Sequence, residues 1–524
     1  MNIIDRVVSA VSPVAGVKRL AARKALKVID GGTGYGNYGA SRSKKSMLGW
    51  IFRGGSANED IHDNLSTLTQ RGRDLYMGVP IATGAIKTMR TNVVGPGLVL
   101  KSQIDYEFLG LTEEEAQKLE NQIEREFALW AESEDCDLER HDNFYELQQL
   151  VYLNWLMSGD VFVLLPKTQR ANAPYDLRLQ LVEADRVSTP NDKSSNPHIV
   201  AGVETDKAGE VVAYHICNSH PLSDGTGMEE KWQRVKAFGD KTGRRNVLHI
   251  MNRERIGQMR GVTFLAPVIE TLKQIARYAD AEMNAAVVNS MLAIFIQKGE
   301  LSGEGAVLGE VVPQAAQVDA ADPKSIEIGS GTIVDLEHGE TVKDVSPSRP
   351  NVNFDNFVSA ICKQIGAATE IPYEVLVRHF GSSYSASRGA LLELWKSVKM
   401  YRSWLASDFC QPVFEEVLAE AVAKGRIGAP GFFTDPAIRK AYSGAQWNGP
   451  AQLSLDPTKE AVAAKIRIEE GFSTRDREAQ ELTGGDFYKI TAQRRREERL
   501  MKEVRDIASG TGQKQEAPEQ AGDK

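Results

Sequence analysis

Two long amphipathic helices with a polar insertion between them constrain the fold of this chain more than any other feature. Residues 264–291 carry apolar side chains at a period of 3.6, and residues 351–372 repeat the pattern. The first helix, of about 26 residues, would be roughly 39 Å long and would need a continuous partner surface. Either it is the central helix of one globular domain, or its apolar stripe exceeds what its own domain covers. The apolar residues on the two stripes are Leu265, Val268, Ile269, Leu272, Ile275, Ala279, Met283, Phe354, Phe357, Ile361 and Ile365.

The composition is that of an ordinary globular protein, with 42% hydrophobic and 26% charged residues in a chain of 524. The net charge of −8 lacks the basic excess that tight binding of nucleic acid requires. Four scattered cysteines form no C-x-x-C pair, which argues against a zinc knuckle, a redox motif and a disulfide framework. No uninterrupted apolar run approaches the roughly 20 residues that span a bilayer, so we expect no membrane segment.

The pattern of the first half predicts helices followed by a β region. Thr112 and Glu115 form a capping box before a helix over 112–133, and a second helix over 144–158 ends at Gly159. The period then changes to that of strands, which indicates a mixed or antiparallel sheet. Strands are predicted within 98–102, 161–166, 177–187, 198–206, 211–218 and 246–251.

The second half predicts a β-containing insertion and further helices. Short β-prone runs occur at 306–312, 325–329 and 332–339, between the two amphipathic helices. A Gly/Ser loop over 378–389 then precedes two separate helices, predicted over 389–404 and 408–422.

No motif for catalysis or nucleotide binding stands out. The chain lacks H-E-x-x-H, G-x-S-x-G and G-x-x-x-x-G-K-[ST], and the G-x-G-x-x-G at 34–39 precedes no convincing helix. The acidic residues Glu132, Glu134, Asp135 and Asp137 could hold a divalent metal, but a solvated helix end is the better interpretation. His215 and His220 flank Cys217 without a fourth ligand. We therefore predict no enzyme activity, no metal and no cofactor.

Six segments between residues 60 and 490 carry a resemblance to a known family. They are RGRDLYMGVPIATGAIKTMRTNVVGPGL at 71–98, WLMSGDVFV at 155–163, LVEADRV at 181–187, RIGQMRGVTFLAPVIETL at 255–272, ATEIPYEVL with GSSYSASRGALLE within 367–393, and DPTKEAVAAKIRIEEGFSTRDRE at 456–478. In this order they resemble the lambda family of phage portal proteins. The first 60 and the last 30 or so residues lie outside the resemblance.

The resemblance implies an α+β, mostly helical portal fold with a wing, long stem helices, a small β-containing clip and a helical C-terminal region. The two amphipathic helices would be the paired stem helices. The expected division of the chain begins with an N-terminal, partly disordered arm at 1–60 and the wing at 61–263. The stem helices follow at 264–291 and 351–372, with the clip at 292–350 between them. The rest consists of the tunnel loop and following helix at 373–403, a C-terminal wing or crown-like region at 404–490, and a tail at 491–524 that is at most a mixed-charge helix before disorder.

The function implied is a homododecameric ring at one capsid vertex, the channel for DNA packaging and ejection. Implied partners are other copies of the chain, double-stranded DNA, the large terminase subunit, head-completion or adaptor proteins, and the major capsid and scaffold proteins. The ring would be part of the virion, assembled in the bacterial cytoplasm. Two alternatives stay open, a nuclease or phosphotransferase acting on phage DNA and a different head–tail connector ring, although connectors are usually much smaller.

The resemblance also implies which residues face DNA. The channel-facing tunnel loop would contain Arg378, His379, Phe380, Gly381, Ser382, Ser383, Tyr384, Ser385 and Arg388. Gly381 and Gly389 would give this loop hinge freedom. Lys396, Lys399 and Arg402 form a basic strip on the next helix, which would either touch backbone phosphates or be a solvated face.

Overall fold

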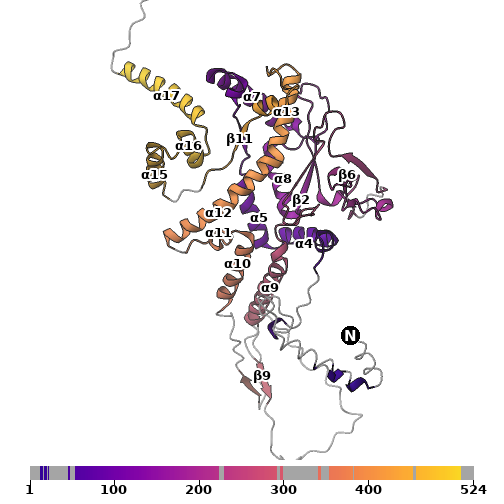
Figure 1. The fold of residues 1–524 in the computed structure, drawn as a ribbon. Coiled ribbons are helices and arrows are strands. Elements are labelled where there is room, and N and C mark those ends of the chain that lie inside the picture. Colours follow the sequence, from indigo (N-terminus) through magenta and orange to yellow (C-terminus); the bar gives the residue numbers. More distant parts are fainter. Residues whose placement is uncertain are drawn as a thin grey trace, which may run out of the picture. The chain divides into compact units, whose positions relative to one another are not determined.

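The structure, a computed structural model, divides into two units, Met1–Ser56 and Ala57–Lys524. Figure 1 draws their described helices and strands as ribbons. In the first unit, the described residues include helical pieces at 13–15 and 17–19 and the 3-10 turn η2 (Lys45–Met47). The described residues of the whole chain are 12–15, 17–19, 22, 45–47, 54–223, 229–291, 295–298, 340–343, 353–381, 383–452 and 456–508.

The second unit is α+β and mostly helical, as predicted. After α3 (Ala57–Asp60) and η3 (His62–Asn64), the helices α4 (Leu65–Gly78) and α5 (Pro80–Val93) pack on α8 (Phe144–Ser158). Val79 alone separates α4 from α5, because a residue before proline avoids the helical region and proline is favoured at the first position of a helix.

Capping interactions define the ends of the next helices. α6 (Tyr106–Leu109) precedes α7 (Glu113–Ala131), where Thr112 and Glu115 form the predicted capping box. Helix α8 begins with a second capping box and ends at Gly159, whose φ of 100° favours glycine. The predicted helix ends are therefore confirmed.

Two antiparallel sheets form the predicted β region. In the first, β2 (Asp160–Leu164) lies between β3 (Gln180–Val182) and β8 (Val247–Met251). The second has the order β4-β5-β6-β7 and is formed by β4 (Ile199–Val200), β5 (Val203–Thr205), β6 (Val211–Cys217) and β7 (Trp232–Lys236). Strand β7 was not predicted, because Gln, Arg and Lys occupy most of its positions. The short turns η4 (Glu134–Cys136), η5 (Ala184–Arg186) and η6 (Asn191–Lys193) connect these elements.

A third sheet joins segments that are far apart in the sequence. Strand β1 (Val99–Ser102), which was predicted, pairs with β11 (Ala445–Asn448), which was not. Their register places Leu100 opposite Trp447. Trp447 reaches an aromatic cluster in the main core, where its ring centroid is 5.8 Å from that of Phe127. This pairing attaches the C-terminal part of the chain to the N-terminal helices.

A fully buried ion pair connects the two larger sheets. The Asp160 carboxylate, in β2, accepts from Arg260 Nε at 2.6 Å, from His249 Nε2 at 3.1 Å and from the Gly261 backbone N–H at 3.0 Å. The Arg260 guanidinium also donates to three backbone carbonyls beside the second sheet, those of Ala184, Val187 and Ala201. Burial alone would raise the pKa of Asp160, but Arg260 and His249 outweigh it and lower that pKa well below its ordinary value.

The two amphipathic helices lie side by side below these sheets (Figure 1). After the turn η7 (Ala266–Val268) they are α9 (Ile269–Met291) and α10 (Phe354–Thr369). Between them, β9 (Phe295–Lys298) and β10 (Glu340–Lys343) form an antiparallel pair that places Phe295 opposite Lys343. The strands predicted at 306–312, 325–329 and 332–339 lie outside the described residues.

The helices that follow differ from prediction in two respects. After α11 (Tyr373–Leu376), helix α12 (Tyr384–Leu405) begins at Tyr384 and not near residue 389. It then continues through a π-helical turn, η9 (Ala406–Cys410), into α13 (Gln411–Ala423), whereas two separate helices were expected. No glycine or proline interrupts residues 403–410, and Pro412 lies at the start of α13, where proline is tolerated.

The C-terminal region contains four more helices. α14 (Pro436–Tyr442) precedes β11, and α15 (Pro457–Glu469), α16 (Arg475–Thr483) and α17 (Phe487–Ala508) follow it. Helix α17 covers residues 491–508 of the segment assigned to the tail, where at most a mixed-charge helix before disorder was expected, so disorder does not describe these residues.

We expect Asp160→Asn to destabilise the second unit by about 3–5 kcal/mol, because it leaves the buried Arg260 without its counter-charge. Urea denaturation followed by circular dichroism measures this change. In the unsubstituted protein the lowered pKa of Asp160 means that its stabilisation is complete above the ordinary carboxyl pKa of about 3.9 and is lost as the pH falls below it.

Asp240→Asn is the matched control, because Asp240 forms an exposed pair with Lys236 in which the side chains are 70% and 50% exposed. Its effect should stay within about 0.5 kcal/mol. Equal effects of the two substitutions would contradict a special role for the buried pair.

Candidate functional site

The segment predicted as the tunnel loop is a short loop that leads directly into α12. Residues 377–383 connect α11 to α12, and the Ser383 hydroxyl accepts from the Ala386 backbone N–H at the first turn. Tyr384, Ser385 and Arg388 therefore lie in the helix and not in the loop, because the Ser383 cap starts the helix early. Ser382 lies outside the described residues.

The loop residues that the structure describes are exposed. Arg378, with φ of 54°, turns the chain in the left-handed region, and His379 and Phe380 follow it at the surface. The Phe380 side chain is 51% exposed. Tyr384, which is 45% exposed, has Lys459 Nζ 5.6 Å from its ring centroid, so the start of α12 lies near α15. Gly381, Ser383, Ser385 and Arg388 are exposed or partly exposed as well.

The predicted basic strip on α12 separates into outward and inward residues. Lys396 is exposed and pairs with Glu393 at 2.6 Å, and Lys399 pairs with Glu481 of α16 at 3.1 Å. Both keep a largely exposed side chain, so the two lysines fit either interpretation, a solvated face or a contact with phosphate.

Arg402 does not belong with these lysines. Its guanidinium donates to the backbone carbonyls of Val93, Asn92 and Pro450 at 2.8–3.0 Å and stacks on Trp395. Burial lowers the pKa of Arg402 to about 10. A Cβ atom at Gly449 would lie 2.7 Å from Arg402 Nε, so glycine there leaves room for the guanidinium. Arg402 therefore joins α5 and the segment after β11 to α12. Because its guanidinium is bound by these carbonyls, the prediction that Arg402 contacts phosphate was wrong.

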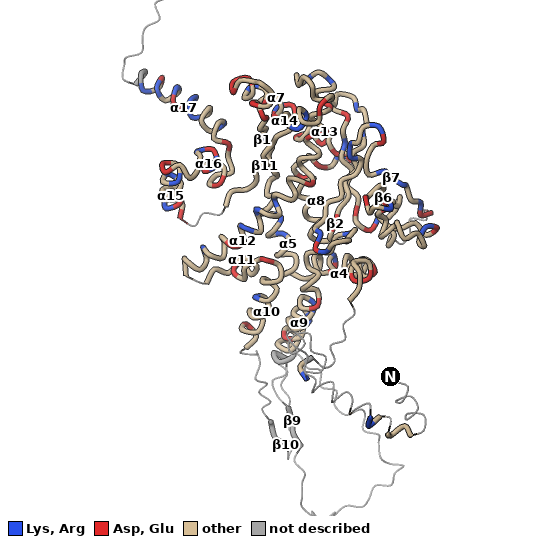
Figure 2. The backbone as a smooth tube through the Cα atoms, in the orientation of Figure 1, with Lys and Arg blue, Asp and Glu red and all other residues tan. Residues whose placement is uncertain are grey.

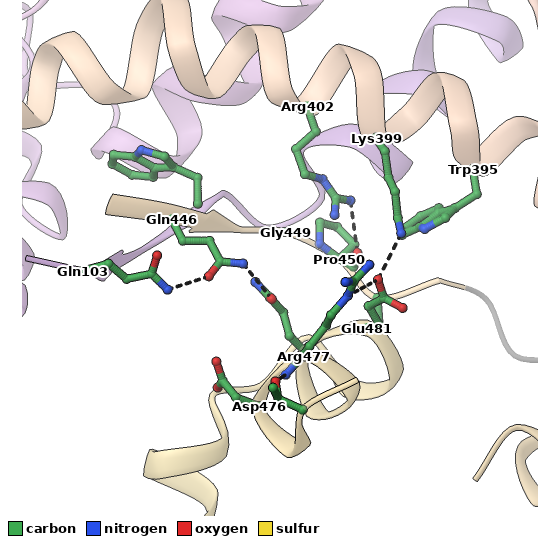
Figure 3. Close-up of a pocket in the computed structure, with 14 residues that line it drawn as sticks. Gln103, Trp395, Lys399, Arg402, Gln446, Gly449, Pro450, Asp476, Arg477 and Glu481 are labelled. Carbon is green, nitrogen blue, oxygen red and sulfur yellow. Dashed lines mark hydrogen bonds and ion pairs between the residues drawn. The ribbon is translucent and has the colours of Figure 1, made fainter. Parts of the chain in front are cut away.

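A polar pocket of about 540 Å³ lies beside this strip (Figure 3). Arg402 and Lys399 project into it from α12, while Glu481 and Arg477 approach from α16. The Lys399–Glu481 ion pair and a chain of glutamine amides cross it, and Arg477 pairs with Glu481 within α16. Its charged groups are thus largely used to hold α16 against α12 and β11.

The stripe residues of the stem helices fall into three groups. Leu265, Val268, Leu272, Ile275 and Ile365 are buried, which extends the main core to the upper part of both helices. Ile269, Ala279, Phe354 and Ile361 are partly buried. Met283 and Phe357 are 63% and 49% exposed, so the lower part of the stripe is only partly covered.

Tyr278 is a stem contact that the sequence stripe missed. Its ring stacks on Phe354, with centroids 5.4 Å apart, and meets Phe357 edge to face at 5.1 Å. Tyr278 lies between the predicted stripe residues Ile275 and Ala279. The rings of Phe354 and Phe357 on the facing helix bring this neighbouring row into the contact.

The residues considered for metal binding have other partners. Asp135 pairs with Arg140 and Arg170, and the Asp137 carboxylate accepts from the backbone N–H groups of Glu139 and His141. His215 Nε2 lies 2.8 Å from Glu204, and burial lowers the pKa of His215. Among the described residues, no group of three or more His, Cys, Asp and Glu side chains is arranged to hold a metal ion.

Within the same residues, no helix is long and apolar enough to cross a membrane.

Comparison with known proteins identifies the class of protein. A family model described as "Phage portal protein, lambda family" matches residues 43–402. The chain therefore belongs to the lambda family of phage portal proteins, and the predicted resemblance is confirmed. This family is structural and not enzymatic.

Two curated relatives extend the similarity over most of the chain. Portal protein B of Escherichia phage lambda is 25% identical over 488 residues, which cover 89% of this chain and 88% of the relative. The portal protein of Escherichia phage N15 is 24% identical over 492 residues, with 89% of each chain covered. Among solved structures, a chain from the neck of a native gene transfer agent particle computed with C12 symmetry is 14% identical, with a TM-score of 0.41, and covers 80% of this chain and 93% of that one.

We predict that Arg402→Ala destabilises the protein by about 2–4 kcal/mol, because three backbone carbonyls lose a charged donor. Lys396→Ala, on the same helix, should change the free energy of unfolding by at most about 0.5 kcal/mol. Urea denaturation of both variants tests whether Arg402 stabilises the fold. An Arg402→Ala protein that is as stable as the unsubstituted chain but contacts DNA more weakly would return Arg402 to the phosphate contacts.

Proposed function

We propose that this chain is one subunit of a closed ring, of about twelve copies, at one vertex of a phage capsid. Double-stranded DNA would pass through the ring during packaging and ejection. The large terminase subunit and later the head-completion or adaptor proteins would dock on the insertion between the stem helices, and the major capsid and scaffold proteins would surround the ring. The protein would reside in the virion after assembly in the bacterial cytoplasm.

The uncovered lower part of the stem is the observation that carries this proposal. Met283 and Phe357 present large apolar side chains on two adjacent helices, and the rest of the described subunit leaves about half or more of each exposed. Apolar surface on a long helix pair is stabilised when a neighbouring copy covers it. A ring, in which each copy presents one face to the next, covers every such surface.

The charge distribution supports a channel that lets DNA slide. Duplex DNA carries about one negative charge per 1.7 Å, and each phosphate that a cation neutralises adds affinity. A strongly basic wall would hold DNA in place, whereas sparse cations on a chain of net charge −8 would let it move. Arg378 in the exposed loop and Lys396 and Lys399 on α12 are such sparse cations.

We further propose that the subunit does no chemistry of its own and that a partner ATPase supplies the energy for DNA movement. The alternative of a nuclease requires metal-dependent cleavage by the purified chain, so incubation of DNA with the protein and Mg²⁺ separates the two.

The double substitution Met283→Asp and Phe357→Asp should lower the fraction of subunits in rings at least roughly tenfold, because a ring would bury unpaired carboxylates. Its thermal unfolding temperature should fall only by the loss of the Phe357 contact with Tyr278, since about half or more of both side chains is exposed in the subunit. Mass photometry and negative-stain class averages measure ring formation.

Leu222→Asp is the control, because Leu222 is also exposed, by 55%, but lies on the wing. Undiminished rings from the stem variant would contradict the proposed role of the stem. A purified chain that remains a monomer at every concentration would contradict the ring itself.

The loop has a separate test. The triple substitution Arg378→Ala, His379→Ala and Phe380→Ala should leave ring formation intact and reduce packaged or retained DNA severalfold, measured as nuclease-protected DNA per particle. A matched triple of wing lysines, Lys207→Ala, Lys231→Ala and Lys241→Ala, should leave packaging unchanged. Normal packaging by the loop variant would remove the loop from the proposal.

A further inference from the structure

Helix α17 has an unusual number of cations without partners. From Arg494 onward it carries six Lys or Arg residues against four acids, Glu497, Glu498, Glu503 and Asp506, and none of the six cations forms an ion pair with a residue that the structure describes. Only Lys489, in the first turn, pairs with another helix, through Glu124 of α7 at 2.8 Å. The six cations are Arg494, Arg495, Arg496, Arg499, Lys502 and Arg505.

The same helix exposes an apolar stripe. Leu500, Met501 and Val504 are 60%, 50% and 58% exposed, and their spacing places them on one face of α17. Arg496 flanks this face on one side, Arg494 and Arg505 flank it on the other, and Glu497 is the acid that lies within it. An apolar stripe bordered by cations is typical of a helix that packs on a surface with apolar and acidic groups.

The chain itself carries a surface of that kind on α6 and α7. Glu107, Glu113 and Glu114 are exposed there, and Phe108 beside them is 58% exposed. Burial, with a contribution from Glu124, raises the pKa of Glu120 on the same helix. Figure 2 shows the acidic positions at α7 and the basic positions along α17. The two surfaces are complementary in charge, and each contains exposed apolar side chains.

Within one subunit the start of α17 reaches this surface, where Lys489 and Ala492 line a cleft together with Glu113 and Gln117 of α7. Helix α17 begins beside α7, where Lys489 contacts Glu124 and Tyr488 lies 5.1 Å from Lys101 Nζ. A straight helix of 22 residues is roughly 33 Å long, so its far half is carried away from this point. No acid of the described residues pairs with the cations of this far half, so they are available to a surface on another molecule.

We propose that the far half of α17, residues 494–508, packs on the acidic surface of α6 and α7 of a second copy of this chain. The inference rests on the proposed ring, in which each copy meets the next through two different faces. One copy contributes the basic and apolar face of α17, and its neighbour contributes Glu107, Phe108, Glu113 and Glu114. DNA is the less suitable occupant, because phosphates would leave Leu500, Met501 and Val504 in water.

A charge-swap experiment on the full-length chain tests this contact. Arg494→Glu, Arg496→Glu and Arg505→Glu together should raise the subunit concentration at half-assembly roughly tenfold at about 0.1 M salt, as expected for three exposed ion pairs. The difference should shrink at about 1 M salt, where the Debye length falls to ~3 Å. Adding Glu107→Arg, Glu113→Arg and Glu114→Arg should restore assembly. Reversal of Lys207, Lys231 and Lys241 to Glu is the matched control and should have no effect.

Cross-linking provides a second measurement that does not depend on assembly strength. The four native cysteines are buried, so introduced cysteines dominate the reaction. Chains with Met501→Cys and chains with Gln117→Cys, co-expressed, should form a disulfide-linked dimer that neither variant forms alone.

Each outcome of these experiments has a distinct meaning. If class averages show rings while the charge swap fails to restore assembly and the mixed disulfide-linked dimer does not form, the proposed contact is overturned. This result leaves the proposed ring. If the α17 variant assembles normally but retains a double-stranded DNA fragment more weakly, the proposed contact between copies is overturned and α17 is a DNA-binding surface. If the unsubstituted chain forms no rings, the proposed function itself fails.

Discussion

The buried Asp160–Arg260 pair is the interaction on which the rest of the second unit depends. Asp160 begins β2 directly after α8, and Arg260 lies a few residues before the first stem helix, so one ion pair fixes the helices, both sheets and the start of the stem. The backbone at Gly159 and the backbone at Gly261 also lie very close together, because a Cβ atom added at Gly261 would be 1.9 Å from the Gly159 carbonyl oxygen. Glycine at both positions lets Asp160 and Arg260 approach to hydrogen-bond distance.

From this fixed point the stem helices leave the core, and their packing changes along their length. Leu272 and Ile275 are buried by the body of the subunit, whereas Met283 and Phe357, farther along, are not. The described residues of the subunit leave this far part of the stripe exposed, and apolar surface of this kind is stabilised when another molecule covers it. This is why the proposed function places ring assembly at the lower part of α9 and α10.

The sequence predicted elements whose signals are local. Thr112 with Glu115 and the glycine after α8 define helix ends through their immediate neighbours, and the stem stripe is a periodicity within one helix. Interactions between distant segments were missed. The pairing of β1 with β11 spans more than three hundred residues, and Arg402 looked like one member of a basic strip because its carbonyl partners come from Asn92, Val93 and Pro450. Tyr278 was missed because the facing helix, and not its own sequence, decides which row is buried.

The cations of this chain fall into classes that the sequence does not separate. Arg260 and Arg402 are bound by internal acceptors, and Lys399 by an acid on another helix, so these charges stabilise the subunit. Those on α17 from Arg494 onward have no such acceptor among the described residues, although the chain as a whole is acidic. When a folded protein has excess acidic side chains on one surface and unpaired basic side chains on another, contact between two copies that brings these surfaces together lowers the electrostatic free energy. The net charge of −8 is thus compatible with strong local attraction between copies, and the same pairing would leave little free positive charge to hold DNA inside a channel.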